Sequence, residues 1–305
     1  MFVQWTARVV SCWALLAAAA AGYGHASFVL VDDFETGYTL NANIGGQNGW
    51  VQGTGVGRPP TTSEVVTDPA DPSNHVLKVS GRDNITYLPT RVPLIEDGHH
   101  GTLFTRFRYE TADGNPDASF GLIWADDILN GDPSNPFDAF ATQVRQTTHF
   151  NARNYGGFAR LDTDPAPILP NTWYSMWMVI NNEERDDSGN EFSEAYDVFD
   201  IFIMADSGPY ASQTELDPAT NDTIFFRRAY RLFDSTTVGL SLTEQPPVLG
   251  VGILLGNNAT DTDALYLDDI YVDGSNNLFA DPTIPEPATL ALAGAGLALL
   301  ASRRR

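Results

Sequence analysis

Residues 264–273 carry the pattern of a β-strand but place two adjacent carboxylates, Asp268 and Asp269, at its centre. With a period of two, Asp269 lies on the face of Leu267, and Asp268 lies on the opposite face with Tyr266. Aspartate is a poor strand former, and a buried carboxylate needs a hydrogen-bond donor, a cation or a metal ion to offset its lost hydration. The sequence therefore predicts a partner for at least one of these two carboxylates.

Residues 28–35, Phe-Val-Leu-Val-Asp-Asp-Phe-Glu, repeat this pattern near the other end of the chain. We expect the first and last strands to lie side by side, which brings their acidic groups together. Oxygen ligands suit calcium, and no thiol competes for it. The residues expected to hold one structural calcium ion are Asp33, Glu35, Asp268 and Asp269. The alternative loop ligands are Asp113, Asp117, Asp186 and Asp187. Solvated acidic turns that cap nearby backbone amides are the simpler interpretation.

The chain is strongly acidic. Its 305 residues include 17 Lys and Arg against 39 Asp and Glu, a formal net charge of -22. Such a surface repels nucleic acid and anionic lipid, so we expect neither as a partner. The single cysteine, Cys12, lies in the leader described next, which excludes disulfides and cysteine-based chemistry from the processed protein.

The first 26 residues have the pattern of a secretory signal peptide. Arg8 precedes an apolar stretch from Val9 to Ala21, and Gly24-His-Ala26 follows as a small-residue cleavage site. The apolar stretch is shorter than the roughly 20 residues that a membrane span needs, so a permanent anchor is the weaker interpretation. We therefore predict export, with cleavage after Ala26.

From residue 27 to about residue 277, short strand patterns alternate with turn signals, and no helical period is evident. Breakers such as Asp71-Pro72, Asp132-Pro133 and Pro246-Pro247 separate the strands. A dozen short strands without helices between them predict an all-β, antiparallel two-sheet β-sandwich. The predicted strands are 76–80, 102–109, 119–124, 140–145, 173–181, 196–204, 224–230, 238–242, 248–255 and the terminal pair.

Residues 173–180, Trp-Tyr-Ser-Met-Trp-Met-Val-Ile, are apolar on both faces. A strand of this kind is expected at the centre of a sheet, covered above and below. A polar loop at 181–190 and a second strand at 196–204 complete a hairpin that we expect at the heart of the core. No internal repeat and no shift in composition marks a second domain before residue 274.

Four short motifs, Asp32-Asp-Phe-Glu35, Gly49-Trp50, Asn171-Thr-Trp-Tyr174 and Leu267-Asp-Asp-Ile-Tyr-Val272, together resemble the concanavalin A-like and laminin-G-like jelly rolls of bacterial exported proteins. The resemblance spans most of residues 28–273. It implies a two-sheet jelly roll whose concave face in relatives often holds a glycan, and often one structural calcium ion.

The end of the chain carries a Pro-Glu-Pro box, an apolar run at 288–301 and a basic terminus. This tail resembles the PEP-CTERM sorting signal of Gram-negative bacteria, which implies recognition by an exosortase and contact with a membrane only through this segment before processing. The residues of this motif are Pro285, Glu286, Pro287, Arg303, Arg304 and Arg305. As a helix, residues 289–302 would extend about 21 Å, less than the roughly 30 Å hydrocarbon core. A simple tail anchor is the alternative.

The predicted organisation has four parts. They are a signal peptide at 1–26, a β-sandwich at 27–273, a linker at 274–283 and a sorting signal with a hydrophobic helix at 284–305.

A candidate ligand site lies on the strand at 102–109, where Phe104, Arg106 and Arg108 share one face. An aromatic ring beside two guanidinium groups suits a sugar ring or an acidic polysaccharide. The aromatic residues that would extend this platform are Trp50, Trp124 and Tyr155. In the alternative interpretation, the aromatic residues belong to the core and the arginines pair with the surplus carboxylates.

Catalytic motifs are missing from the sequence. It contains no Gly-x-Ser-x-Gly, no His-Glu-x-x-His and no phosphate-binding glycine loop. His99 and His100 are expected in a turn without metal. We therefore expect noncatalytic binding of extracellular polysaccharide, at the cell surface or in a biofilm matrix. A glycan hydrolase or lyase on the concave face is the alternative, and a structural matrix protein without a small ligand is the second alternative.

Overall fold

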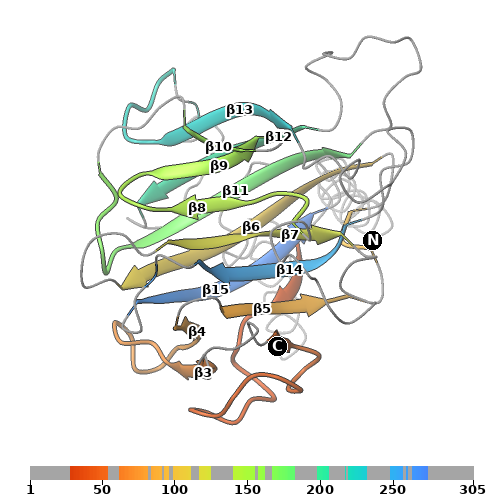
Figure 1. Cartoon of the computed structure of the whole chain (residues 1–305), viewed down its shortest axis with the longest axis vertical. Coiled ribbons are helices and arrows are strands. Elements are labelled where there is room, and N and C mark those ends of the chain that lie inside the picture. Colours follow the sequence, from red (N-terminus) through yellow and green to blue (C-terminus); the bar gives the residue numbers. More distant parts are fainter. Residues whose placement is uncertain are drawn as a thin grey trace, which may run out of the picture. The chain divides into compact units, whose positions relative to one another are not determined.

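The computed structural model describes residues 28–273 except 54–61, 82–83, 91–92, 96–98, 111–116, 125–139, 155–156, 162–166, 183–197, 206–216, 218, 232–247, 257–258 and 260–262. Fifteen strands form two antiparallel sheets in this part of the chain, which contains no α-helix (Figure 1). The described residues accordingly include no helix of the length and hydropathy needed to cross a membrane. The all-β sandwich predicted from the sequence is confirmed.

One sheet has eight strands, in the order β13-β12-β11-β6-β15-β4-β3, with β1 also paired to β15. Its strands are β1 (Val29–Asp32), β3 (Thr62–Thr67), β4 (His75–Ser80), β6 (His99–Glu110), β11 (Trp173–Asn182), β12 (Val198–Ala205), β13 (Phe225–Arg231) and β15 (Ala264–Asp273). The first half of β15 pairs with β4 and its second half pairs with β1. The two terminal strands are therefore neighbours, as the sequence predicted.

The second sheet has seven strands, in the order β10-β9-β8-β7-β14-β5-β2. Its strands are β2 (Val51–Gly53), β5 (Asn84–Pro89), β7 (Ala118–Trp124), β8 (Val144–Gln146), β9 (Phe150–Asn154), β10 (Gly157–Arg160) and β14 (Val248–Leu255). Five of the short strands, β2, β3, β5, β9 and β10, were not among those predicted. They are short or polar, so their alternation of polar and apolar residues is weak.

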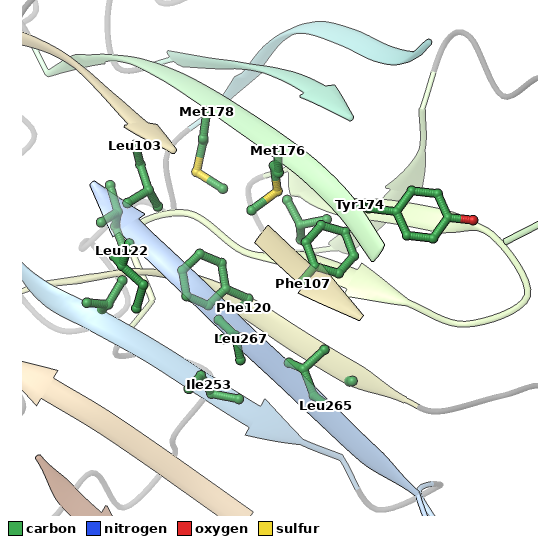
Figure 2. Close-up of a cluster of buried hydrophobic side chains, with 14 of the residues drawn as sticks. Leu103, Phe107, Phe120, Leu122, Tyr174, Met176, Met178, Ile253, Leu265 and Leu267 are labelled. Atoms are coloured by element: carbon green, nitrogen blue, oxygen red, sulfur yellow. The ribbon is translucent and has the colours of Figure 1, made fainter. Parts of the chain in front are cut away.

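The main core lies between the sheets and is apolar (Figure 2). Leu265 and Leu267 of β15 contribute to it from the eight-stranded sheet, and Phe120 and Ile253 contribute from the seven-stranded sheet. Burial of such side chains stabilises the fold by about 1.5–3 kcal/mol each. Strand β11 lies between β12 and β6 and has buried side chains on both faces, which confirms its predicted central position.

The period-two assignment of β15 was wrong at its centre. Leu267 and Ile270 both pack into the main core although they are three residues apart, and the pairing with β6 shifts register between Asp268 and Tyr271. Asp269 has a positive φ of 54°. These features mark a β-bulge, in which one extra residue re-aims the side chains beside it. The bulge lies where β15 changes partner from β4 to β1.

Other predicted segments differ or lie outside the described residues. The predicted strand at 140–145 is replaced by a bridge between Phe140 and Ile123, an irregular segment and the short β8. His99 and His100 begin strand β6, whereas the sequence placed them in a turn. The strand at 238–242, the leader with Ala26, and the tail with its predicted helix lie outside the described residues.

Candidate functional site

The β-bulge of β15 places both carboxylates beside Arg106 of β6. Arg106 Nη1 lies 3.2 Å from Asp269 Oδ2 and 3.6 Å from Asp268 Oδ2. Asn74 donates a second hydrogen bond to Asp268 Oδ2 at 2.9 Å. The guanidinium also lies over the ring of Trp173, 5.3 Å from its centre. The two carboxylates therefore have a cationic partner, and this partner is an arginine.

Asp268 is almost completely buried, with 2% of its surface exposed. Burial first, and then the neighbouring carboxylate of Asp269, raise the pKa of Asp268 to about 7. Hydrogen bonds from Asn74 and the charge of Arg106 act in the opposite direction. The cluster is thus a buried ion-pair network with one carboxyl group poised to take up a proton near neutral pH.

Arg108 lies one row further along the same face of β6 and is 8% exposed. It donates to Asn171 at 3.0 Å, lies 3.7 Å from Asp68 and sits over the ring of Tyr266 at 5.2 Å. The interpretation in which both arginines pair with surplus carboxylates therefore describes the structure. Arg108 in particular is committed to structural contacts.

Phe104 does not offer the exposed ring that the sequence prediction required, because it is fully buried. It lies in a cross-strand row of aromatic side chains on the face of the eight-stranded sheet that points away from the main core. The members of this row are Tyr271, Phe104, Trp177, Phe202 and Phe226. Neighbouring rings in this row pack against one another, with 5.1 Å between the ring centres of Phe104 and Trp177. The rings therefore occupy the space in which a sugar would have to stack.

Trp50 is also fully buried, so it is no stacking platform. Its indole N–H donates to Asp32 at 2.8 Å, and its ring packs against Phe34 at 5.7 Å between centres. The side chain of Trp124 and all of Tyr155 lie outside the described residues.

The four carboxylates predicted to hold calcium have other partners in the structure. Asp33 accepts the backbone N–H of Glu35, and the Glu35 carboxylate lies 3.2 Å from His75. Asp268 and Asp269 face Arg106. Among the described residues, no group of three or more His, Cys, Asp or Glu side chains is placed to hold a metal ion. Of the alternative ligands, Asp117 pairs with Arg145 and the others lie outside the described residues. Calcium binding stays a prediction.

A different surface combines arginine, amide and aromatic side chains. We call it the arginine face. It consists of Gln143, which immediately precedes β8, and of Arg145, Asn151, Arg153, Phe158 and Arg160 of strands β8 to β10. In this sheet Val144, Ala152 and Ala159 pack toward the main core, so the residues beside them point to the opposite face.

The strand register arranges this face in two rows. Arg145, Asn151 and Arg160 are direct cross-strand partners in one row. Arg153 and Phe158 are partners in the next row, and the Arg153 N–H donates to the Gln143 carbonyl at 2.9 Å. The first row therefore spans three strands and the second spans β9, β10 and the residue before β8, with arginine next to amide or aromatic groups in both.

Several contacts fix the side chains of the arginine face. Arg145 Nε donates to the buried Asp117 at 2.6 Å, and its guanidinium lies over the Phe158 ring at 5.1 Å from the centre. Arg160 lies 3.0 Å from His149 Nδ1. Because a guanidinium only donates, His149 Nδ1 is the acceptor in this contact. Arg160 is exposed, while Arg153 and Phe158 are half-buried.

The arginine face was missed in the sequence analysis, although the sequence contains a signal for it. Residues 139–161 hold Arg145, Arg153 and Arg160 and no Asp or Glu, in a chain with 39 acidic residues. The pairing of three short strands is what converts this stretch into one surface.

Comparison with known proteins gives a match at the C-terminus. Residues 283–305 match the PEP-CTERM protein-sorting motif. This motif implies exosortase-type sorting and marks an exported protein that is processed at the membrane. No curated protein has a sequence that matches the chain.

Solved structures with a similar strand arrangement include lectin II from Ulex europaeus, with a TM-score of 0.44 at 11% identity, covering 80% of this chain and 100% of the lectin. A cellulose-induced protein has a TM-score of 0.43 at 14% identity, covering 80% and 96%. A carbohydrate esterase from Shiga toxin-encoding bacteriophage phi24B has a TM-score of 0.39 at 12% identity, covering 74% and 90%. At these values the similarity says nothing about ligand or reaction.

Proposed function

We propose that this chain is an exported protein that binds extracellular polysaccharide without cleaving it, and that the arginine face is its binding surface. The observation that carries the proposal is the two-row arrangement of guanidinium, amide and aromatic groups on β8 to β10. Guanidinium and amide groups donate to sugar hydroxyls, and a half-exposed ring such as Phe158 packs against the apolar face of a sugar. The place of action is the cell surface or the extracellular matrix, reached after the tail is processed.

Cleavage is the less favoured function. A glycan hydrolase needs two carboxyl groups that reach the bond to be cut. Asp268 has the raised pKa expected of a general acid, but it is buried and held by Asn74 and Arg106. Its neighbour Asp269 is paired with the same arginine. This geometry fits a structural network better than an acid and base pair.

The test is a glycan array followed by product analysis of every glycan that is retained. We expect retention of intact oligosaccharides, and loss of retention in the Arg153→Ala and Phe158→Ala variants. Lys78→Ala is the matched control, because Lys78 is a cation on β4 of the other sheet. Shortened products would show an enzyme instead. Absence of both retention and products across a broad array would favour a purely structural matrix protein.

A further inference from the structure

We infer that the polysaccharide bound by the arginine face is anionic, with carboxylate or sulfate groups placed between its arginines. This inference rests on the function proposed above and names the chemical class of its ligand. Three observations support it: the distribution of charge, the spacing of the arginines, and a buried amide in the same surface.

The charge of the arginine face is opposite to that of the whole chain. Strands β7 to β10 contain three arginines and no Asp or Glu, whereas the full sequence has a net charge of -22. Asp117, just before β7, pairs with Arg145. An acidic protein that gathers cations on one surface focuses a positive potential there and directs anions to it.

The spacing of the arginines suits a chain with repeated anionic groups. Neighbouring strands lie about 4.8 Å apart, so Arg145 and Arg160, two strands apart in one row, have backbones about 10 Å apart. Arg153 lies in the next row on the middle strand, about 7 Å along that strand from Asn151. Arg145 is already paired with Asp117, so the separated anions would be bound by Arg153 and Arg160, each of which can donate to a carboxylate or sulfate through its own fork.

The third observation is the buried amide group of Gln143. Its side chain is fully buried, and within the described part of the structure neither its amide oxygen nor its amide nitrogen has a hydrogen-bond partner. An unsatisfied buried amide destabilises a fold, so its presence calls for an explanation. The Gln143 backbone carbonyl accepts from the Arg153 N–H, which places Gln143 beside Arg153, and a polar ligand that displaced the atoms covering its amide would satisfy it.

The experiment measures retention by two matched pairs of polysaccharides. One pair is polygalacturonate and its carboxyl-reduced, neutral form; the other is dextran sulfate and dextran. We expect retention by at least one anionic member and none by its neutral partner, with affinity that falls as salt rises from 50 to 300 mM. The first pair reports a carboxylate ligand and the second a sulfated one.

Variants connect the retention to this surface. Arg153→Ala and Arg160→Ala should each weaken binding of the anionic polysaccharide at least about tenfold, since a hydrogen bond to a charged group is lost. Arg153→Lys should keep more affinity than Arg153→Ala, because it keeps the charge and loses the planar fork. Melting curves of all variants show whether they are folded. Gln143→Leu should raise the melting temperature and weaken binding, an opposite pair of effects that a purely structural glutamine would not give.

Three results would overturn the inference. Equal retention of the anionic and neutral members of a pair would mean that the face binds polysaccharide without regard to charge, which leaves the proposed function standing. Retention of polyglutamate as strong as that of the anionic polysaccharides would mean that any polyanion binds, and would contradict specific recognition of polysaccharide. If neutral glycans alone are retained on the array, the anionic inference fails and the proposed function survives.

Discussion

Arg106 Nη1 lies 3.2 Å from Asp269 Oδ2, and this contact exists because β15 bulges at that point. The bulge brings Asp268 toward the same guanidinium, so one cation serves two carboxylates. Arg106 is only a quarter exposed, and both acids are less exposed than it is. Removing one partner of such a group leaves the others desolvated and unpaired.

Arg106→Ala should therefore destabilise the protein by about 2–3 kcal/mol, since partial solvent access reduces the full cost of a broken buried pair. Urea denaturation gives the free energy of unfolding. Arg106→Lys should lose less, because it keeps the charge. In the Arg106→Ala background, Asp269→Asn should recover part of the lost free energy of unfolding, because it removes an unpaired charge. A double variant no more stable than Arg106→Ala alone would show that the ion pair does not contribute to stability.

The raised pKa of Asp268 predicts a pH dependence of stability. The folded state holds this proton up to pH about 7, whereas an unfolded aspartate releases it near its ordinary value of 3.8. Between these values the folded state binds more protons, so the Asp268 contribution to stability is largest at low pH and falls as pH rises toward 7. Asp268→Asn should flatten this part of the curve of melting temperature against pH.

The control for the pH experiment is Asp222→Asn, which removes an exposed carboxylate. It should leave the slope between pH 4 and 7 in place. An equal change of melting temperature between pH 4 and 7 in Asp268→Asn and in the wild type would contradict the assignment to Asp268.

Calcium gives a separate test of the acidic cluster. Arg106 already places a positive charge beside Asp268 and Asp269, so a divalent cation there would be repelled. For these carboxylates we expect equal melting temperatures with millimolar calcium and with chelator. A rise with calcium that disappears in the Asp33→Asn, Glu35→Gln variant would restore the metal site proposed from the sequence, because a ligand of the native state stabilises it by mass action.

The sequence was sufficient to predict the architecture where alternation was strong. Strand β15 was predicted because apolar side chains alternate with other side chains along it, and this alternation fixes which face is buried. The pairing of the terminal strands was predicted from their similar acidic patterns. The bulge at Asp268 and Asp269 could not be predicted in this way. It depends on the change of neighbour from β4 to β1, which is a property of the assembled sheet.

Phe104 shows the other limit of local patterns. Its burial depends on Trp177 and Phe202, which pair beside it although they are far away in sequence. The arginine face has the same origin, since Arg145 and Arg160 become partners of Asn151 only when β8, β9 and β10 pair. The acid-free stretch at 139–161 was visible in the sequence, but its arrangement in two rows was not.

Trp50 offers a test of how the first strand is held. Its indole donates to Asp32 at the end of β1, and the same carboxylate accepts from the Tyr38 hydroxyl and the Phe34 backbone N–H. Asp32→Ala leaves these donors unpaired and should destabilise the protein by about 2–4 kcal/mol. Trp50→Phe removes one donor and some volume, and should cost less. Equal free energies of unfolding of the two variants in urea would show that the additional hydrogen bonds accepted by Asp32 do not contribute measurably to stability.

The sorting tail should direct processing without contributing to the stability of the β-sandwich. Residues 28–280 form one compact unit, and the last strand, β15, ends at Asp273, before the Pro-Glu-Pro box. Deletion of residues 284–305 should therefore leave the melting temperature unchanged while it abolishes processing and changes the cell fraction in which the protein is found. A full-length variant with Pro285→Ala, Glu286→Ala and Pro287→Ala separates the two effects, since it should lose processing without loss of chain length. A fall of several degrees in the melting temperature of the truncated protein would show that the tail contributes to the fold and is more than a sorting signal.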